Sequence, residues 1–79
     1  MKENKEQKWL KFMDRWLKEN GSIPLKEAIN SGAYVADASS LSTQRYLQKH
    51  ASAVGRFMVI IDADYVKRVV VRDQHKSHL

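Results

Sequence analysis

The side chains best suited to chemistry in this 79-residue chain are polar and basic, and they gather between positions 40 and 49. The run Ser-Leu-Ser-Thr-Gln-Arg-Tyr-Leu-Gln-Lys supplies hydroxyl, amide, guanidinium and ammonium groups within ten residues. Hydroxyl groups at a helix N-terminus can bond phosphate oxygens, together with the unpaired backbone N–H groups there. Glutamine and arginine can also bond base edges, glutamine favouring adenine and arginine guanine. The run therefore indicates nucleic acid as a partner, and an ordinary solvated helix face stays open as the alternative.

Three other groupings of reactive residues do not predict a catalytic or metal site. His75 and His78 have a spacing that suits a metal, but no third ligand accompanies them. Asp62 and Asp64 are explained better by turn chemistry. His50 has no Ser, Asp or Glu partner placed by spacing, so we expect a partly buried helix residue or a phosphate neighbour rather than a general base. The chain also lacks cysteine. We therefore expect no enzyme activity, no cofactor and no metal.

The net charge of +5 is unevenly spread along the chain. Residues 1–37 carry seven basic and six acidic side chains, a net of +1, whereas residues 38–79 carry seven basic and three acidic, a net of +4. The basic residues of the second half are Arg45, Lys49, Arg56, Lys67, Arg68, Arg72 and Lys76. This imbalance suits a polyanionic partner such as nucleic acid, or less often anionic lipid, and it suits an incidentally basic solvated surface equally well.

Apolar residues at helical spacing predict a first helix over Lys5–Glu19, with lysine and arginine on its other side. Gly21 is expected to end this helix. Ser22–Pro24 should be extended, and Pro24 should open a second helix over Pro24–Ser31, because proline suits the first helical position. Gly32 is expected to end that helix.

Ser39 or Ser40 is a suitable N-cap for a third helix over Ser40–Ala53, ended by Gly55. The side chains of this helix expected to face inward are Leu41, Tyr46 (or the stem of Arg45), Leu47, Ala51 and Val54. Those expected to face out are Ser40, Thr43, Gln44, Gln48 and Lys49. After position 55 the spacing changes to β-branched runs, which predict a hairpin from Phe57 to Arg72. We expect the tail, residues 74–79, to be polar and flexible. The residues expected to be mostly buried are Trp9, Phe12, Met13, Trp16, Ile29, Leu47, Val59 and Ile61.

The order helix, extended segment, helix, helix, hairpin resembles a winged helix-turn-helix domain over residues 5–73. The run Leu41–Lys49 is similar to recognition helices of that family, in which a Ser/Thr-rich start precedes an Arg-Tyr-Leu-like triplet and basic residues. The resemblance implies that this helix enters the major groove and that the hairpin lies on neighbouring phosphates or the minor groove. The residues expected to contact nucleic acid are Ser40, Ser42, Thr43, Gln44, Arg45, Gln48, Lys49, Lys67, Arg68 and Arg72.

One feature departs from the family pattern. The predicted connection from Gly32 to Ala38 is longer than the tight turn that the family uses between its second and third helices. This length favours a variant of the fold with a role other than base reading.

The sequence thus predicts a single α+β domain spanning residues 1–79, a three-helix winged helix-turn-helix with a C-terminal β-hairpin wing. We expect a cytoplasmic protein, nucleoid-associated if it binds DNA, that acts as a small regulator of transcription or replication. Its binding to duplex DNA, rather than RNA, is expected to be either sequence-specific or general, with a homodimer or a partner protein as open alternatives to a single chain. No membrane partner is expected. The alternative is a winged-helix module that binds a partner protein without nucleic acid, because fold alone does not decide function.

Overall fold

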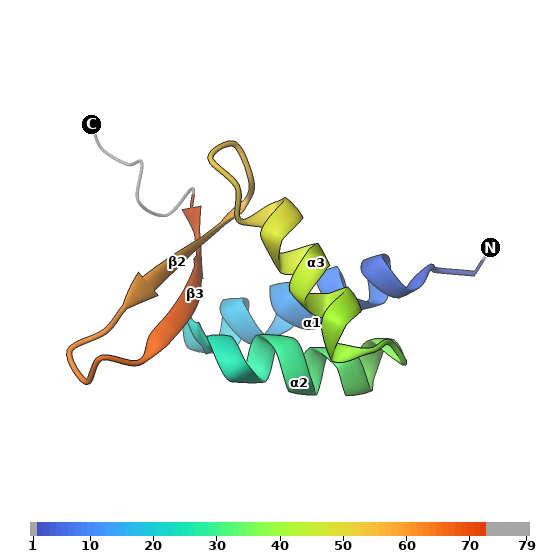
Figure 1. The fold of residues 1–79 in the computed structure, drawn as a ribbon, viewed down its shortest axis with the longest axis horizontal. Helices are drawn as coiled ribbons and strands as arrows, with labels where there is room; N and C mark the ends of the chain where they lie inside the picture. Colours follow the sequence, from blue (N-terminus) through green and yellow to red (C-terminus); the bar gives the residue numbers. More distant parts are fainter. Residues whose placement is uncertain (1, 73–79) are drawn as a thin grey trace.

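A computed structural model describes residues 2–72 and contains, within them, three helices and a three-stranded antiparallel sheet (Figure 1). The elements are α1 (Lys5–Asn20), β1 (Ile23–Pro24), α2 (Leu25–Ala36), α3 (Ser40–His50), β2 (Phe57–Ile61) and β3 (Lys67–Val71). The hairpin of β2 and β3 follows the helices, so the predicted α+β class and C-terminal hairpin are confirmed. This order is compatible with a winged-helix arrangement. The predictions for the tail, including His75 and His78, lie outside the described residues.

Helix α1 begins and ends where the sequence predicts. At its start, the Asn4 side chain accepts a hydrogen bond from the Gln7 backbone N–H at 2.8 Å, and the Gln7 side chain accepts from Asn4 N–H at 3.0 Å. This reciprocal cap satisfies two N–H groups that the helix leaves unpaired. At its end, Gly21 takes a φ of +82°, which glycine adopts without a Cβ penalty. Within the described residues, no helix is long and apolar enough to span a membrane.

Helix α2 is longer than the sequence predicts, and the predicted long connection from Gly32 to Ala38 is wrong. The helix continues through Gly32 to Ala36, and only three residues separate it from α3. Asp37 turns the chain in the left-handed conformation, with φ +55°. Ser39 then caps α3, because its hydroxyl accepts from the Ser42 backbone N–H at 3.0 Å. The turn between α2 and α3 is therefore tight, and the departure from the family pattern disappears.

The sheet joins β1, which lies between α1 and α2, to the hairpin that follows the helices, in the order β1-β3-β2. The predicted extended segment around Ile23 pairs with Val69 of β3, whose other neighbour in the sheet is β2. Pro24 ends this strand and precedes the first turn of α2 rather than lying within it. Ile23, Phe57 and Val69 are all fully buried, so one face of the sheet packs on the helices.

Trp9 lies at the centre of the core. Its ring centroid is 5.9 Å from those of Tyr46 and Phe57, and 6.1 Å from that of His50. Its buried indole N–H donates to the carbonyl oxygen of Ala28 at 2.9 Å. The indole therefore joins all three helices to β2 through one side chain.

The predicted core is confirmed at Trp9, Met13 and Leu47, while Phe12, Trp16 and Ile29 are half-buried. The prediction was wrong for Val59 and Ile61, which are 42% and 62% exposed. The reason is that the helices cover only the Phe57 end of β2, and the hairpin extends beyond them (Figure 1). The prediction was also wrong for Leu41 and Val54, which are exposed. Helix α3 stops at His50, three residues before its predicted end, so Val54 lies in the following turn.

Candidate nucleic-acid interface

The outward face of α3 carries five of the ten residues that the sequence predicts to contact nucleic acid. Ser40, Gln44, Arg45, Gln48 and Lys49 are all exposed. Positions three and four apart are neighbours on a helix surface, so these side chains form one continuous strip. We call this strip the α3 face. It offers two amides, a guanidinium, an ammonium and a hydroxyl group without any carboxylate.

The structure contradicts the outward placement of Thr43. Its side chain is fully buried, and its hydroxyl lies 2.9 Å from the carbonyl oxygen of Ile29 and 3.0 Å from that of Ser40. A buried hydroxyl needs such partners, because an unpaired polar group in the interior costs free energy. Thr43 therefore fixes α3 onto α2 and is not available to nucleic acid.

The hydroxyl groups at the start of α3 already have partners. The Ser42 hydroxyl accepts from Ser39 Oγ at 2.9 Å, and Ser42 is half-buried. Ser40 donates to the side-chain oxygen of Asn30 over a longer distance of 3.3 Å. Ser40 remains exposed and its bond is weak, so it keeps its predicted role more readily than Ser42.

Lys49 and His50 meet an acidic partner that the sequence did not reveal. Glu6, at the start of α1, lies 3.0 Å from Lys49 Nζ and 2.6 Å from His50 Nε2. The hydrogen bonds from His50 and Lys49 lower the pKa of the Glu6 carboxyl from its ordinary value. These partners are 43 and 44 residues apart in sequence, so no local spacing could have indicated them. One charge of the α3 face is thus partly neutralised.

The predicted hairpin residues differ in their exposure and in their contacts within the protein. Arg68 donates from Nε to the Ser22 hydroxyl at 2.8 Å, and its Nη1 lies 3.8 Å from Asp62. Lys67 is exposed beside the first turn of α2, where it lines a shallow apolar groove with Leu25 and Ile29. Lys67 is therefore the predicted hairpin cation with the most freedom to meet a phosphate.

Arg72 holds a loop together. Its Nε donates to the carbonyl oxygen of Gly55 at 3.0 Å, and its Nη2 donates to those of Ser52 and Phe57 at 2.8 and 2.9 Å. A guanidinium has five N–H groups, so only the two on Nη1 remain for another partner. The residue ties the segment between α3 and β2 to the end of β3.

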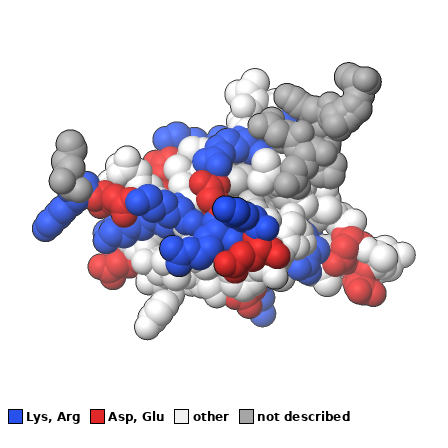
Figure 2. All heavy atoms as spheres, turned by 180° about the vertical axis from the view of Figure 1, so that it is seen from behind, with Lys and Arg blue, Asp and Glu red and all other residues white. Residues whose placement is uncertain are grey.

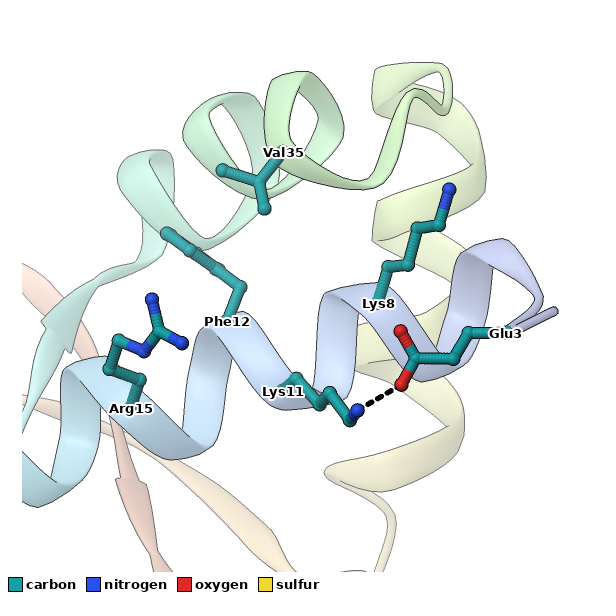
Figure 3. A pocket seen from close by; sticks show the side chains of 6 residues that line it. All are labelled: Glu3, Lys8, Lys11, Phe12, Arg15 and Val35. Carbon is teal, nitrogen blue, oxygen red and sulfur yellow. Dashed lines mark ion pairs between the residues drawn. The ribbon is translucent and has the colours of Figure 1, made fainter. Parts of the chain in front are cut away.

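A second basic surface lies between α1 and α2, on the side of α1 where the sequence predicts lysine and arginine. A groove of about 330 Å³ is lined by Glu3, Lys8, Lys11, Phe12, Arg15 and Val35 (Figure 3). Seen from behind, Lys and Arg side chains gather across the middle of the molecule, interrupted by a few acidic ones (Figure 2). The available signal was the recurrence of lysine and arginine at positions 8, 11 and 15, one face of a helix. We call this surface the α1 groove.

Among residues 2–72, no three His, Asp or Glu side chains are placed to hold a metal ion. No protein-family model, curated protein or solved structure matches the chain. The likeness to winged-helix domains therefore rests on the element order, and the roles of individual residues rest on their chemistry and exposure.

Proposed function

We propose that the protein is a DNA-binding module that reads duplex DNA with the α3 face, as a small regulator of transcription or replication. The observation that carries the proposal is the division of α3 into two sides. Thr43 and Leu47 seal one side against the core, while Gln44, Arg45 and Gln48 stand free on the other. A helix with this division can lie in the major groove and present amide and guanidinium groups to base edges.

The tight turn between α2 and α3 supports the same reading. In a helix-turn-helix the second helix enters the groove while the first crosses the backbone. The exposed Lys67 of the hairpin is placed to meet a neighbouring phosphate, as the predicted wing would do.

A partner protein is the second candidate. Its support is the apolar surface that the structure leaves uncovered, with Tyr34 and Val54 almost fully exposed and Ile61 exposed on the hairpin. The inward bonding of Arg72 and Arg68 also reduces the number of cations available to DNA.

Fluorescence anisotropy with labelled random duplexes across a salt series tests the proposal. If about three phosphates are contacted, the logarithm of the affinity should fall with the logarithm of the salt concentration with a slope of about −3. Folded protein that shows no binding at low salt would remove DNA binding and leave the partner protein as the better candidate.

A further inference from the structure

The α1 groove combines three cations with an apolar floor. Lys8, Lys11 and Arg15 project along its rim from α1, and Phe12 and Val35 close it from below and from α2 (Figure 3). Seven residues of helix separate Lys8 from Arg15, which corresponds to about 10 Å along the axis. One strand of a duplex presents about three phosphate charges over that length, since it carries one per about 3.4 Å of helix axis. The three cations of the rim therefore equal in number the phosphates that one strand presents over the same length.

The cations of the groove form few ion pairs within the protein that a ligand would have to break. Within the described part of the chain, Lys8 and Arg15 form no ion pair, whereas Lys49, Arg56 and Arg68 each face a carboxylate. Lys11 pairs with Glu3, but the two side chains are 72% and 37% exposed. Exposed pairs of this kind contribute little, so a phosphate can replace Glu3 at low cost. Among residues 2–72, two of the three groove cations are thus free of any ion pair, and the third has only an exposed one.

The groove and the α3 face lie on different sides of α1. Lys8 of α1 lines the groove, while Glu6 of the same helix meets Lys49 of the α3 face. These two α1 side chains are two positions apart, which separates them by about 200° around the helix. A ligand on one surface therefore leaves the other open.

We propose that the α1 groove binds the phosphodiester backbone of a second duplex segment, so that one molecule holds two segments at once. Lys8, Lys11 and Arg15 contact phosphates, and the apolar floor of Phe12 and Val35 contacts the carbon edge of deoxyribose. Contacts of this type position a duplex without reading its sequence. The proposal extends the function proposed for α3, on which it rests, from binding DNA to linking it.

The test is a bridging assay, in which a duplex fixed on beads captures a second labelled duplex of unrelated sequence through the protein. The wild-type chain should capture it. The triple variant Lys8→Gln, Lys11→Gln, Arg15→Gln should lose capture while still binding one duplex. In solution with excess duplex, when both surfaces of the wild type are occupied, the total salt slope should be smaller by about 2–3 in that variant. These residues are exposed, and circular dichroism would confirm that the variant folds.

A matched control separates the groove from net charge. The variant Lys2→Gln, Lys5→Gln, Lys26→Gln removes the same charge from residues that do not line the groove, and it should still capture the second duplex. Conversely, Glu3→Gln should strengthen capture, because it removes the one carboxylate of the groove. Glu27→Gln, with the same charge change on α2, should strengthen it less.

The possible failures are distinguishable. Capture that persists in the groove variant would overturn the proposal, because bridging would then come from a dimer that uses two α3 faces. Equal loss of capture in both triple variants would also overturn it. A chain that binds no duplex at all would instead refute the function proposed for α3. Capture that depends on the groove, with single-duplex binding unaffected by changes on α3, would refute only the reading of base edges.

Discussion

Gly32 lies so close to Trp9 that a Cβ at position 32 would stand 2.6 Å from the indole Cδ1 and 2.7 Å from Nε1. The glycine therefore allows α2 and α1 to pack closely against each other. It does so in the middle of a helix, where glycine costs about 1 kcal/mol of stability relative to alanine. The indole cannot move aside easily, because it is fully buried and its N–H is bonded to Ala28.

We expect Gly32→Ala to destabilise the protein by about 1–3 kcal/mol, the usual range for overpacking, despite the higher helix propensity of alanine. Urea unfolding measures the change. In a Trp9→Phe background the smaller ring leaves room, so the cost of the same substitution should fall. An alanine at position 32 that raised stability in the wild-type background would show that the contact is looser than described.

The ionisation of Glu6 should make the stability of the folded protein depend on pH. The pKa of Glu6 is lowered in the folded protein by hydrogen bonds from His50 and Lys49, whereas a glutamate in an unfolded chain has a pKa of about 4.3. A carboxyl whose pKa is lower in the folded state stabilises the folded protein at pH values above its unfolded pKa. This stabilisation is lost as the pH falls through the folded pKa.

The wild-type protein should therefore be more stable than Glu6→Gln at pH 7, and the difference should shrink as the pH falls below about 4. Thermal unfolding of both proteins between pH 2.5 and 7 measures it. A difference that stays constant over this range would mean that the Glu6 contacts do not depend on its charge.

Arg72 should matter to stability as well as to any ligand. Arg72→Ala removes the donor to three carbonyl oxygens, and hydrogen bonds from a charged group contribute about 1.5–3 kcal/mol each, without simple additivity. We expect a loss of at least about 1.5 kcal/mol, measured by urea unfolding. Lys67→Ala, at an exposed position at the other end of β3, should change stability little. If both variants unfold like the wild type, Arg72 has no structural role and its predicted phosphate contact regains weight.

The base-edge contacts and the phosphate contacts proposed for DNA should respond differently to mutation. Gln48→Ala should reduce the difference in binding free energy between a preferred and a random duplex by about 1–3 kcal/mol, because it removes an amide proposed to bond base edges. Lys67→Ala should weaken all duplexes alike and reduce the salt slope by about one. Anisotropy titrations on both duplexes measure these effects. Equal weakening of the two duplexes by Gln48→Ala would contradict a role in sequence reading.

The sequence predicted most elements of the fold because each has a clear local period. Helix α1 and the hairpin follow directly from spacing, and the caps at Gly21 and Ser39 were visible as residue types. Gly32 misled because glycine both ends helices and permits close contact, and only the position of Trp9 decides between these roles. The length of α2 was therefore beyond local reasoning.

The candidate site was predictable in part for the same reason. The exposed residues of α3 follow from helical period, and that period also places Thr43 with the buried Leu47, although its hydroxyl suggested an outward position. The partners of Arg72 and Lys49 come from other elements. Their commitment to internal bonds could not be inferred before the fold was known.

The order of strands has a consequence for how the chain is made. Among residues 2–72, β3 is the last strand in sequence and the central one in the sheet, so Ile23 and Phe57 have no strand to pair with until Lys67–Val71 has been synthesised. A nascent chain that has reached Ile61 already carries all three helices together with two unpaired apolar strands. The sheet therefore assembles in a single late event, and a ribosome that stalls within the hairpin would release a product with exposed strand edges, a substrate for chaperones and proteases.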